Sequence, residues 1–201
     1  QIVPKSYSAP GSTSNPFMKG YVLLNAPYIN QNEAGAPMGC EAASLLQALR
    51  VRGKATNYSL RNFLREMPIS PTGDPNKGFG GTPYAVTPGV YQSIYPEPLA
   101  NWGKRYANVE NISGSSSASL QNHLQLGNPI VVYVTLDFQT PVYNRYFFGV
   151  AIDNAHIMTL DGYNFSTQQY HVSDPVRGKY WVNATTFERS YNVKKFAVAV
   201  K

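Results

Sequence analysis

The stretch Met38-Gly39-Cys40-Glu41-Ala42-Ala43-Ser44-Leu45-Leu46 decides the fold, because it places the only cysteine of a 201-residue chain at the start of a predicted helix. Its two leucines and Leu49 recur at the spacing that lines one face of a helix, and Gly53 predicts the helix end. A helix N-terminus favours an anion such as a thiolate, so we expect a depressed pKa for Cys40. The alternative is a lone cysteine that serves as a small buried hydrophobe.

Composition narrows the classes of protein to consider. Lysine and arginine number 17 against 11 acidic residues, a net charge of +6, and they are scattered along the chain. This distribution argues against a nucleic-acid partner but allows weak attraction to an anionic cell surface. No apolar run reaches the roughly 18 residues of a membrane span. One cysteine allows neither an internal disulfide nor a cysteine-rich zinc site, and we expect no metal or other cofactor.

The order of the predicted elements indicates the fold class. Residues 1–17 are rich in Ser and Pro and are interpreted as an extended arm, followed by one domain over 18–201. Helices are expected first and strands afterwards, which predicts an α+β fold with a largely antiparallel sheet. After the cysteine helix, we expect helices at 60–66, 98–106 and 117–127, and strands at 130–135, 155–160, 170–174 and 196–200.

A long loop separates the second and third predicted helices. Residues 68–88 are dense in turn formers yet contain several aromatic residues, and ordered loops of this kind often line binding sites. Gly80, Gly81 and Tyr84 are therefore candidate substrate-binding residues. The glycine pair has a second interpretation as turn chemistry alone.

A cysteine nucleophile needs a general base, and the chain has three histidines. His123 lies among polar helix residues and is most simply solvated. His171 alternates with apolar residues on a predicted strand and could face either way. His156 begins a strand directly after a polar stretch, which is a rigid place to hold a base.

A family resemblance emerges from five motifs taken together. They are Gln31, Gly39-Cys40-Glu41-Ala42-Ala43, Asn154-Ala155-His156, Asp161-Gly162-Tyr163 and Ser173-Asp174-Pro175. In this order they resemble the bacterial double-glycine-peptidase-like cysteine peptidases, a branch of the papain-like superfamily. The resemblance implies a papain-like fold, in which an N-terminal helical lobe with the nucleophile helix packs on a mainly antiparallel β-sheet.

The resemblance also implies the roles of four residues. Cys40 is the nucleophile, His156 the base, and Asp174 the acid that orients the histidine. Gln31 is the oxyanion donor, with Asn30, Asn32 or a backbone N–H as alternatives because Gln31 lies nine positions before the cysteine.

Asp161 is the alternative orienting acid, although its Asp-Gly sequence favours a turn. An antiparallel return through residues 164–167 would instead bring Asp174 opposite position 157, close to His156.

The sequence therefore predicts a cysteine peptidase that cleaves peptide or isopeptide bonds of a peptide or protein substrate. The abundance of Tyr, Asn and Ser is familiar in secreted bacterial proteins, so we expect a secreted or surface-associated monomer. Two alternatives remain. One is an envelope amidase or transpeptidase with the same triad, and the other is a catalytically silent papain-like binding module.

Overall fold

The computed structural model describes residues 2–5 and 19–201. Its strands are β1 (Ile2–Lys5), β2 (Lys19–Leu23), β3 (Val109–Asn111), β4 (Ile130–Thr135), β5 (Tyr143–Tyr146), β6 (Gly149–Ile152), β7 (Ala155–Asn164), β8 (Gln169–Asp174), β9 (Gly178–Asn183) and β10 (Ala197–Val200). Its helices are α1 (Cys40–Val51), α2 (Leu60–Leu64), α3 (Pro96–Gly103), α4 (Ser117–Gln125) and α5 (Ala184–Tyr191), with a short 3₁₀ turn, η1 (Leu136–Phe138). Most of the predicted arm lies outside the described residues, and its one described part, β1, pairs with β2.

Eight of these strands form one sheet, and all strand pairs described in it are antiparallel. The ten-residue strand β7 is its centre. The first part of β7 pairs with β4 and its last part with β2, while β8 lies along its other edge. The α+β, mainly antiparallel architecture predicted from the sequence is confirmed.

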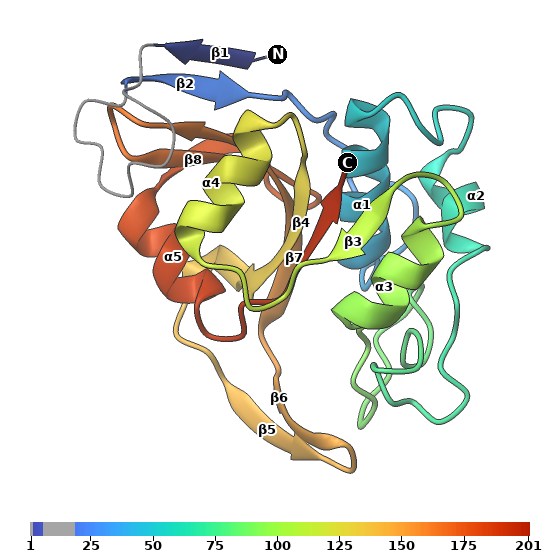
Figure 1. Cartoon of the computed structure of the whole chain (residues 1–201). Helices are drawn as coiled ribbons and strands as arrows, with labels where there is room; N and C mark the ends of the chain where they lie inside the picture. Colours follow the sequence, from blue (N-terminus) through green and yellow to red (C-terminus); the bar gives the residue numbers. More distant parts are fainter. Residues whose placement is uncertain (1, 6–18) are drawn as a thin grey trace.

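The sheet separates two hydrophobic cores (Figure 1). Side chains along a strand point alternately to opposite faces. On β4, Val131 and Tyr133 therefore face α1, α2 and α3, whereas Ile130, Val132 and Val134 face α4 and α5. The run of β-branched residues at 130–135, interrupted only by Tyr133, thus reflects a strand that is covered on both faces.

Helix α1 is the element on which the first core is built. Residues 41–49 are all buried, so the helix is covered around its whole circumference rather than on the single apolar face expected from the sequence. Its polar side is not exposed to solvent because Glu41 and Gln47 find partners inside the protein. Gly53 ends the helix with φ near +70°, and the N–H of Lys54 then reaches the carbonyl of Leu49.

The structure also adds elements that the sequence patterns did not predict. These are β3, β9, α5 and the two-stranded hairpin of β5 and β6, which projects away from the body of the molecule (Figure 1). The third helix begins at Pro96 rather than Pro98, because proline fits the first turn of a helix, where its missing N–H is not needed.

Candidate active site

Cys40 is the first residue of α1 and lies half-buried at the edge of a cleft. Its thiol donates a hydrogen bond to Oε1 of Glu41 at 3.2 Å. Burial, followed by the negative charge and hydrogen-bond acceptance of Glu41, raises the pKa of Cys40 well above its ordinary value. The expectation of a depressed pKa is therefore wrong for this structure. An adjacent carboxylate and burial outweigh the helix N-terminus.

Glu41 is a site residue to which the sequence interpretation gave no role. Its buried carboxylate accepts from the hydroxyl of Ser93 at 2.6 Å and from the N–H of Ile94 at 3.1 Å. Burial raises the pKa of Glu41, against the lowering effect of these donors. Glu41 thereby fixes the loop before α3 to the start of α1. The signal available in the sequence was a carboxylate next to the cysteine at the start of a mainly apolar helix.

His156 and Asp174 form a buried pair near the ends of two adjacent strands. Nε2 of His156 lies 2.7 Å from Oδ1 of Asp174. Asp174 also accepts from the backbone N–H groups of Val176 and Arg177 and from the hydroxyl of Tyr180. Burial alone would raise the pKa of Asp174, but the hydrogen bond and charge of His156, with these donors, lower it. The pairing predicted for these two residues is therefore present.

The strand register differs slightly from the predicted one. Thr159 pairs with Ser173, so the next residue of β8, Asp174, is opposite position 158 of β7 rather than 157. Asn164 pairs with Gln169, so the turn lies one residue later than expected and shifts the pairing by two positions, and a bulge between Leu160 and Gly162 takes back one of them. Asp161 and Gly162 are thus inside β7, and the interpretation of Asp-Gly as a turn is wrong. The glycine is required because a Cβ there would lie 2.7 Å from the carbonyl oxygen of Val22 on β2.

Asp161 belongs to a second buried pair. Its Oδ1 lies 2.6 Å from Nδ1 of His171, and its Oδ2 accepts from the N–H of Ala26 at 2.7 Å. His171 packs edge-on against Trp181 of β9. This pair fixes the chain that leaves β2, and it is separate from the cleft residues.

Gln31 lies on that same chain and lines the cleft together with Cys40. Its side-chain amide donates to the carbonyl of Pro37 at 2.7 Å, its backbone N–H donates to the carbonyl of Pro175, and its Oε1 is buried without a hydrogen-bond partner. The structure brings Gln31 to the same cleft as the proposed nucleophile and base.

Gln47 connects the four segments that carry these side chains. From the buried face of α1, its Oε1 accepts from Ile29, and its amide group donates to the hydroxyl of Thr159 and the carbonyl of Ser173. These partners lie on the Gln31 segment, on β7 and on β8. Gln47 is two turns along α1 from Cys40, so it holds the helix in register with the strands of His156 and Asp174.

The cleft has a volume of about 450 Å³ and lies between the helical lobe and the sheet. Besides Gln31, Cys40 and His156, it is lined by residues of the loop before α3 and of the hairpin base, including Val86, Tyr91, Leu136, Tyr146 and Asn154. Gly80, Gly81 and Tyr84 are not among the lining residues. The predicted loop reaches the cleft only at its end, through Val86 and Thr87, and residues 90–93 that follow it also line the cleft.

The predicted glycine positions serve to pack that loop. A Cβ at Gly80 would lie 2.3 Å from the carbonyl oxygen of Tyr91, and Gly81 has φ near +71°. Tyr84 is exposed and lies under the guanidinium of Arg61. A role for these three residues in substrate binding stays a prediction.

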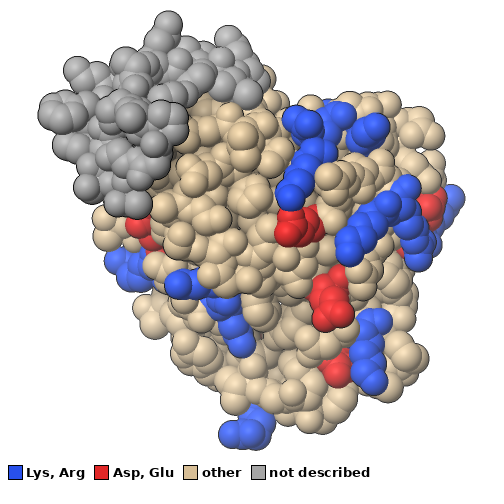
Figure 2. Space-filling model, viewed as in Figure 1, with Lys and Arg blue, Asp and Glu red and all other residues tan. Residues whose placement is uncertain are grey.

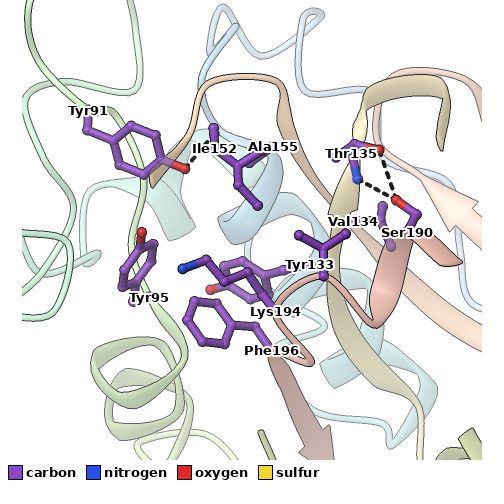
Figure 3. Close-up of a pocket in the computed structure, with 11 residues that line it drawn as sticks. Tyr91, Tyr95, Tyr133, Val134, Thr135, Ile152, Ala155, Ser190, Lys194 and Phe196 are labelled. Carbon is purple, nitrogen blue, oxygen red and sulfur yellow. Dashed lines mark hydrogen bonds between the residues drawn. The ribbon is translucent and has the colours of Figure 1, made fainter. Parts of the chain in front are cut away.

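A smaller aromatic pocket lies beside the cleft and shares Tyr91, Ile152 and Ala155 with it (Figure 3). The hydroxyl of Tyr91 donates to the carbonyl of Ile152 at 2.8 Å, and that of Tyr133 donates to the carbonyl of Ile94. The first bond joins the loop of the helical lobe to β6, so it ties the two walls of the cleft together.

Charged side chains are spread over the molecular surface. In the view of Figure 2, lysines and arginines alternate with acidic residues and form no continuous stripe on that face. No helix in the described part of the chain combines the length and apolar character that a membrane crossing needs. Residues 2–5 and 19–201 also hold no cluster of three or more His, Cys, Asp or Glu side chains suited to a metal ion.

Comparison with known proteins now identifies the family. Residues 23–198 match the Peptidase_C39 like family. The chain belongs to this family. It is 35% identical over 123 residues to the uncharacterized protein YvpB of Bacillus subtilis (strain 168), a match that covers 56% of this chain and 48% of that protein. The chain thus spans about half the length of the curated relative it matches.

A solved structure supports the fold. A protein from Bacillus anthracis, described as a C39-like peptidase, superposes with a TM-score of 0.77 at 22% identity over 90% of this chain and 98% of that one. The fold is that of a C39-like peptidase, as the family resemblance implied.

Proposed function

We propose that this protein is a cysteine peptidase in which Cys40, His156 and Asp174 act as a triad on peptide or isopeptide bonds. The observation that carries the proposal is the buried His156–Asp174 hydrogen bond at the edge of a cleft that the only cysteine also lines. An acid bonded to one imidazole nitrogen fixes the tautomer and leaves the other nitrogen for the nucleophile.

The first chemical step is proton removal from the thiol. Because Glu41 and burial favour the protonated thiol, we propose that His156 acts as a general base when substrate is bound, not as one half of a preformed ion pair. The thiol leaves Glu41 and gives its proton to Nδ1 of His156, and the sulfur forms a bond to the substrate carbonyl carbon. Asp174 stabilises the imidazolium that results.

The remaining steps follow from the same groups. The amide of Gln31 and the backbone N–H of Cys40 stabilise the oxyanion, with Asn30 or Asn32 as alternative donors. His156 returns the proton to the leaving amine as the C–N bond breaks, which leaves an acyl-thioester. Water then attacks the thioester, His156 takes its proton, and the acid product and free thiol are released.

The enzymatic alternatives to a peptidase differ from it in the group that attacks the thioester or in the substrate. If an amine instead of water attacks it, the protein is a transpeptidase; if the substrate is an envelope amide, the protein is an amidase. We propose that the enzyme works in a secreted or surface-associated setting as a monomer, consistent with its dispersed charge of +6. The silent binding module differs in having a Cys40 that does not react with substrates.

The test begins with a mixed peptide library incubated with the protein and analysed by mass spectrometry. Wild type is expected to cleave peptides, and Cys40→Ala is expected to cleave none while unfolding at the same denaturant concentration. Added hydroxylamine should trap the thioester as a hydroxamate. An epoxide inhibitor directed at thiol peptidases should label Cys40 once per chain. No cleavage and no labelling would leave the silent module as the function.

A further inference from the structure

The hairpin of β5 and β6 carries the largest concentration of exposed apolar side chains near the cleft. Val142 is 53% exposed, Tyr143 60%, Phe147 74% and Val150 45%. We call these four residues the hairpin patch. Single exposed apolar residues are ordinary, but four within nine positions on one projecting element indicate an interaction surface.

The hairpin is held to the helical lobe beside its tip and is closed at its base. The rings of Tyr146 and Phe148 stack on each other at 5.6 Å, and both contact Tyr91 in the loop before α3. The side chain of Asn154 accepts from the N–H of Val142 and donates to the carbonyl of Thr140, which closes the base. An arm held at both places presents its apolar residues with little loss of freedom on binding.

The register shows how the patch is arranged. Tyr143 is opposite Ile152, and Arg145 is opposite Val150, so Tyr143, Arg145 and Val150 share one face of the hairpin. Phe147 occupies the tip. The sheet has only two strands, so each is an edge strand that an extended peptide can approach.

The hairpin patch is continuous with the cleft. Tyr146, Ile152 and Asn154 belong to the hairpin or its base and line the cleft, and His156 follows two residues after Asn154. A polypeptide bound across Cys40 and His156 therefore passes along this arm as it leaves the cleft.

From this placement, we propose that the β5–β6 hairpin is a docking arm for an extended, apolar segment of a polypeptide substrate, outside the residues that flank the scissile bond. The inference rests on the proposed peptidase function. It implies that long unfolded chains are better substrates than short peptides with the same cleavage sequence.

The experiment compares a long and a short substrate. The long probe is reduced, carboxymethylated α-lactalbumin, and the short probe is a synthetic peptide that covers only a cleavage site mapped in it. The test variant is Tyr143→Ser with Phe147→Ser, two residues that do not line the cleft. The control is Leu126→Ser, which is exposed to the same 74% as Phe147 but lies at the end of α4.

The double variant is expected to lower kcat/KM for the long probe about tenfold through a higher KM, and to leave the short peptide within twofold of wild type. The control should change neither substrate. An equal loss on both substrates, or no loss on the long probe, would overturn the docking arm.

Two further measurements separate other outcomes. If wild type cleaves nothing, the peptidase function has failed; the docking arm is then tested by fluorescence anisotropy, in which labelled α-lactalbumin should bind Cys40→Ala protein about tenfold less tightly with the hairpin changes. If sedimentation instead shows a dimer that the hairpin changes abolish, the patch serves a second copy of this chain, and the proposal is wrong.

Discussion

The two buried His–Asp pairs of this protein have nearly the same hydrogen-bond length, but they use different ring nitrogens and have different surroundings. His156 and Asp174 are joined at 2.7 Å, and His171 and Asp161 at 2.6 Å, on the same two neighbouring strands. The first pair opens onto the cleft that holds Cys40. The second packs against Trp181 and holds the backbone of Ala26. A short His–Asp bond is therefore not evidence of catalysis until a nucleophile and open space accompany it.

Removing the acid from each pair gives the sharpest contrast. Asp174→Ala should reduce turnover by about 100- to 10,000-fold, because His156 loses the group that fixes its tautomer. Asp161→Ala should leave the turnover of folded protein nearly unchanged. It should instead lower the free energy of unfolding by about 3 kcal/mol, since His171 and the N–H of Ala26 lose their buried acceptor.

Both variants are measured for kcat on one peptide substrate and for stability in urea. Asp174→Asn is the matched control, because it retains an acceptor for His156 and should be milder than Asp174→Ala. An inactive but stable Asp161 variant beside an active Asp174 variant would reverse the assignment of the two pairs.

Gln47 offers a second test, because two of its hydrogen-bond partners, Thr159 and Ser173, lie between the two His–Asp pairs along β7 and β8. Gln47→Leu keeps the volume of the side chain but removes the acceptor of one buried donor, the N–H of Ile29, and the donor to two buried acceptors, the hydroxyl of Thr159 and the carbonyl of Ser173. We expect a loss of about 2–4 kcal/mol of unfolding free energy and a fall in turnover on the order of tenfold. The fall should appear in kcat more than in KM, since the alignment of Cys40 with His156 changes.

The matched control is Leu46→Ala, the preceding residue of the same helix. It is fully buried and should cost about 2–5 kcal/mol without breaking a polar contact. Equal losses of kcat in the two variants at equal stability would mean that Gln47 acts only as part of the core.

The sequence predicted the parts of the fold whose patterns arise from burial. The β-branched run at 130–135 matches β4 residue for residue, and the helix at Cys40 begins where expected. It missed the β5–β6 hairpin, whose exposed aromatic residues follow no core periodicity. It also missed β9, a short strand with alternate burial, and α5, whose Thr-rich start resembles a loop.

Within the candidate site, the sequence again predicted only the features that follow from patterns along the chain. The pairing of His156 with Asp174 depends on strand order, which the sequence reveals. The roles of Asp161 and Glu41 depend on what surrounds them in space. Asp161 is next to a glycine because β2 passes too close for a Cβ, and not because the chain turns there.

The smallest expected effect concerns Glu41, the acid that accepts a hydrogen bond from the thiol of Cys40. Glu41→Gln removes a charge that raises the pKa of Cys40 and keeps an oxygen that can accept from Ser93 and Ile94. The pKa of Cys40 should fall toward its ordinary value. The rate of alkylation by iodoacetamide at pH 8 should therefore rise by about two- to fivefold, since the rate follows the fraction of thiolate.

The pH dependence of the free energy of unfolding tests the Glu41→Gln variant independently. The folded protein raises the pKa of Glu41 above 4.5, so it binds a proton there more tightly than the unfolded chain does. Wild type therefore loses stability as the pH rises from 4.5 through the folded pKa, and the carboxamide variant should not. Urea unfolding at pH 4.5 and pH 7 measures this, with the exposed Glu33→Gln as control. An unchanged alkylation profile together with an unchanged pH dependence of stability would show that Glu41 does not govern the thiol, and that burial alone keeps Cys40 protonated.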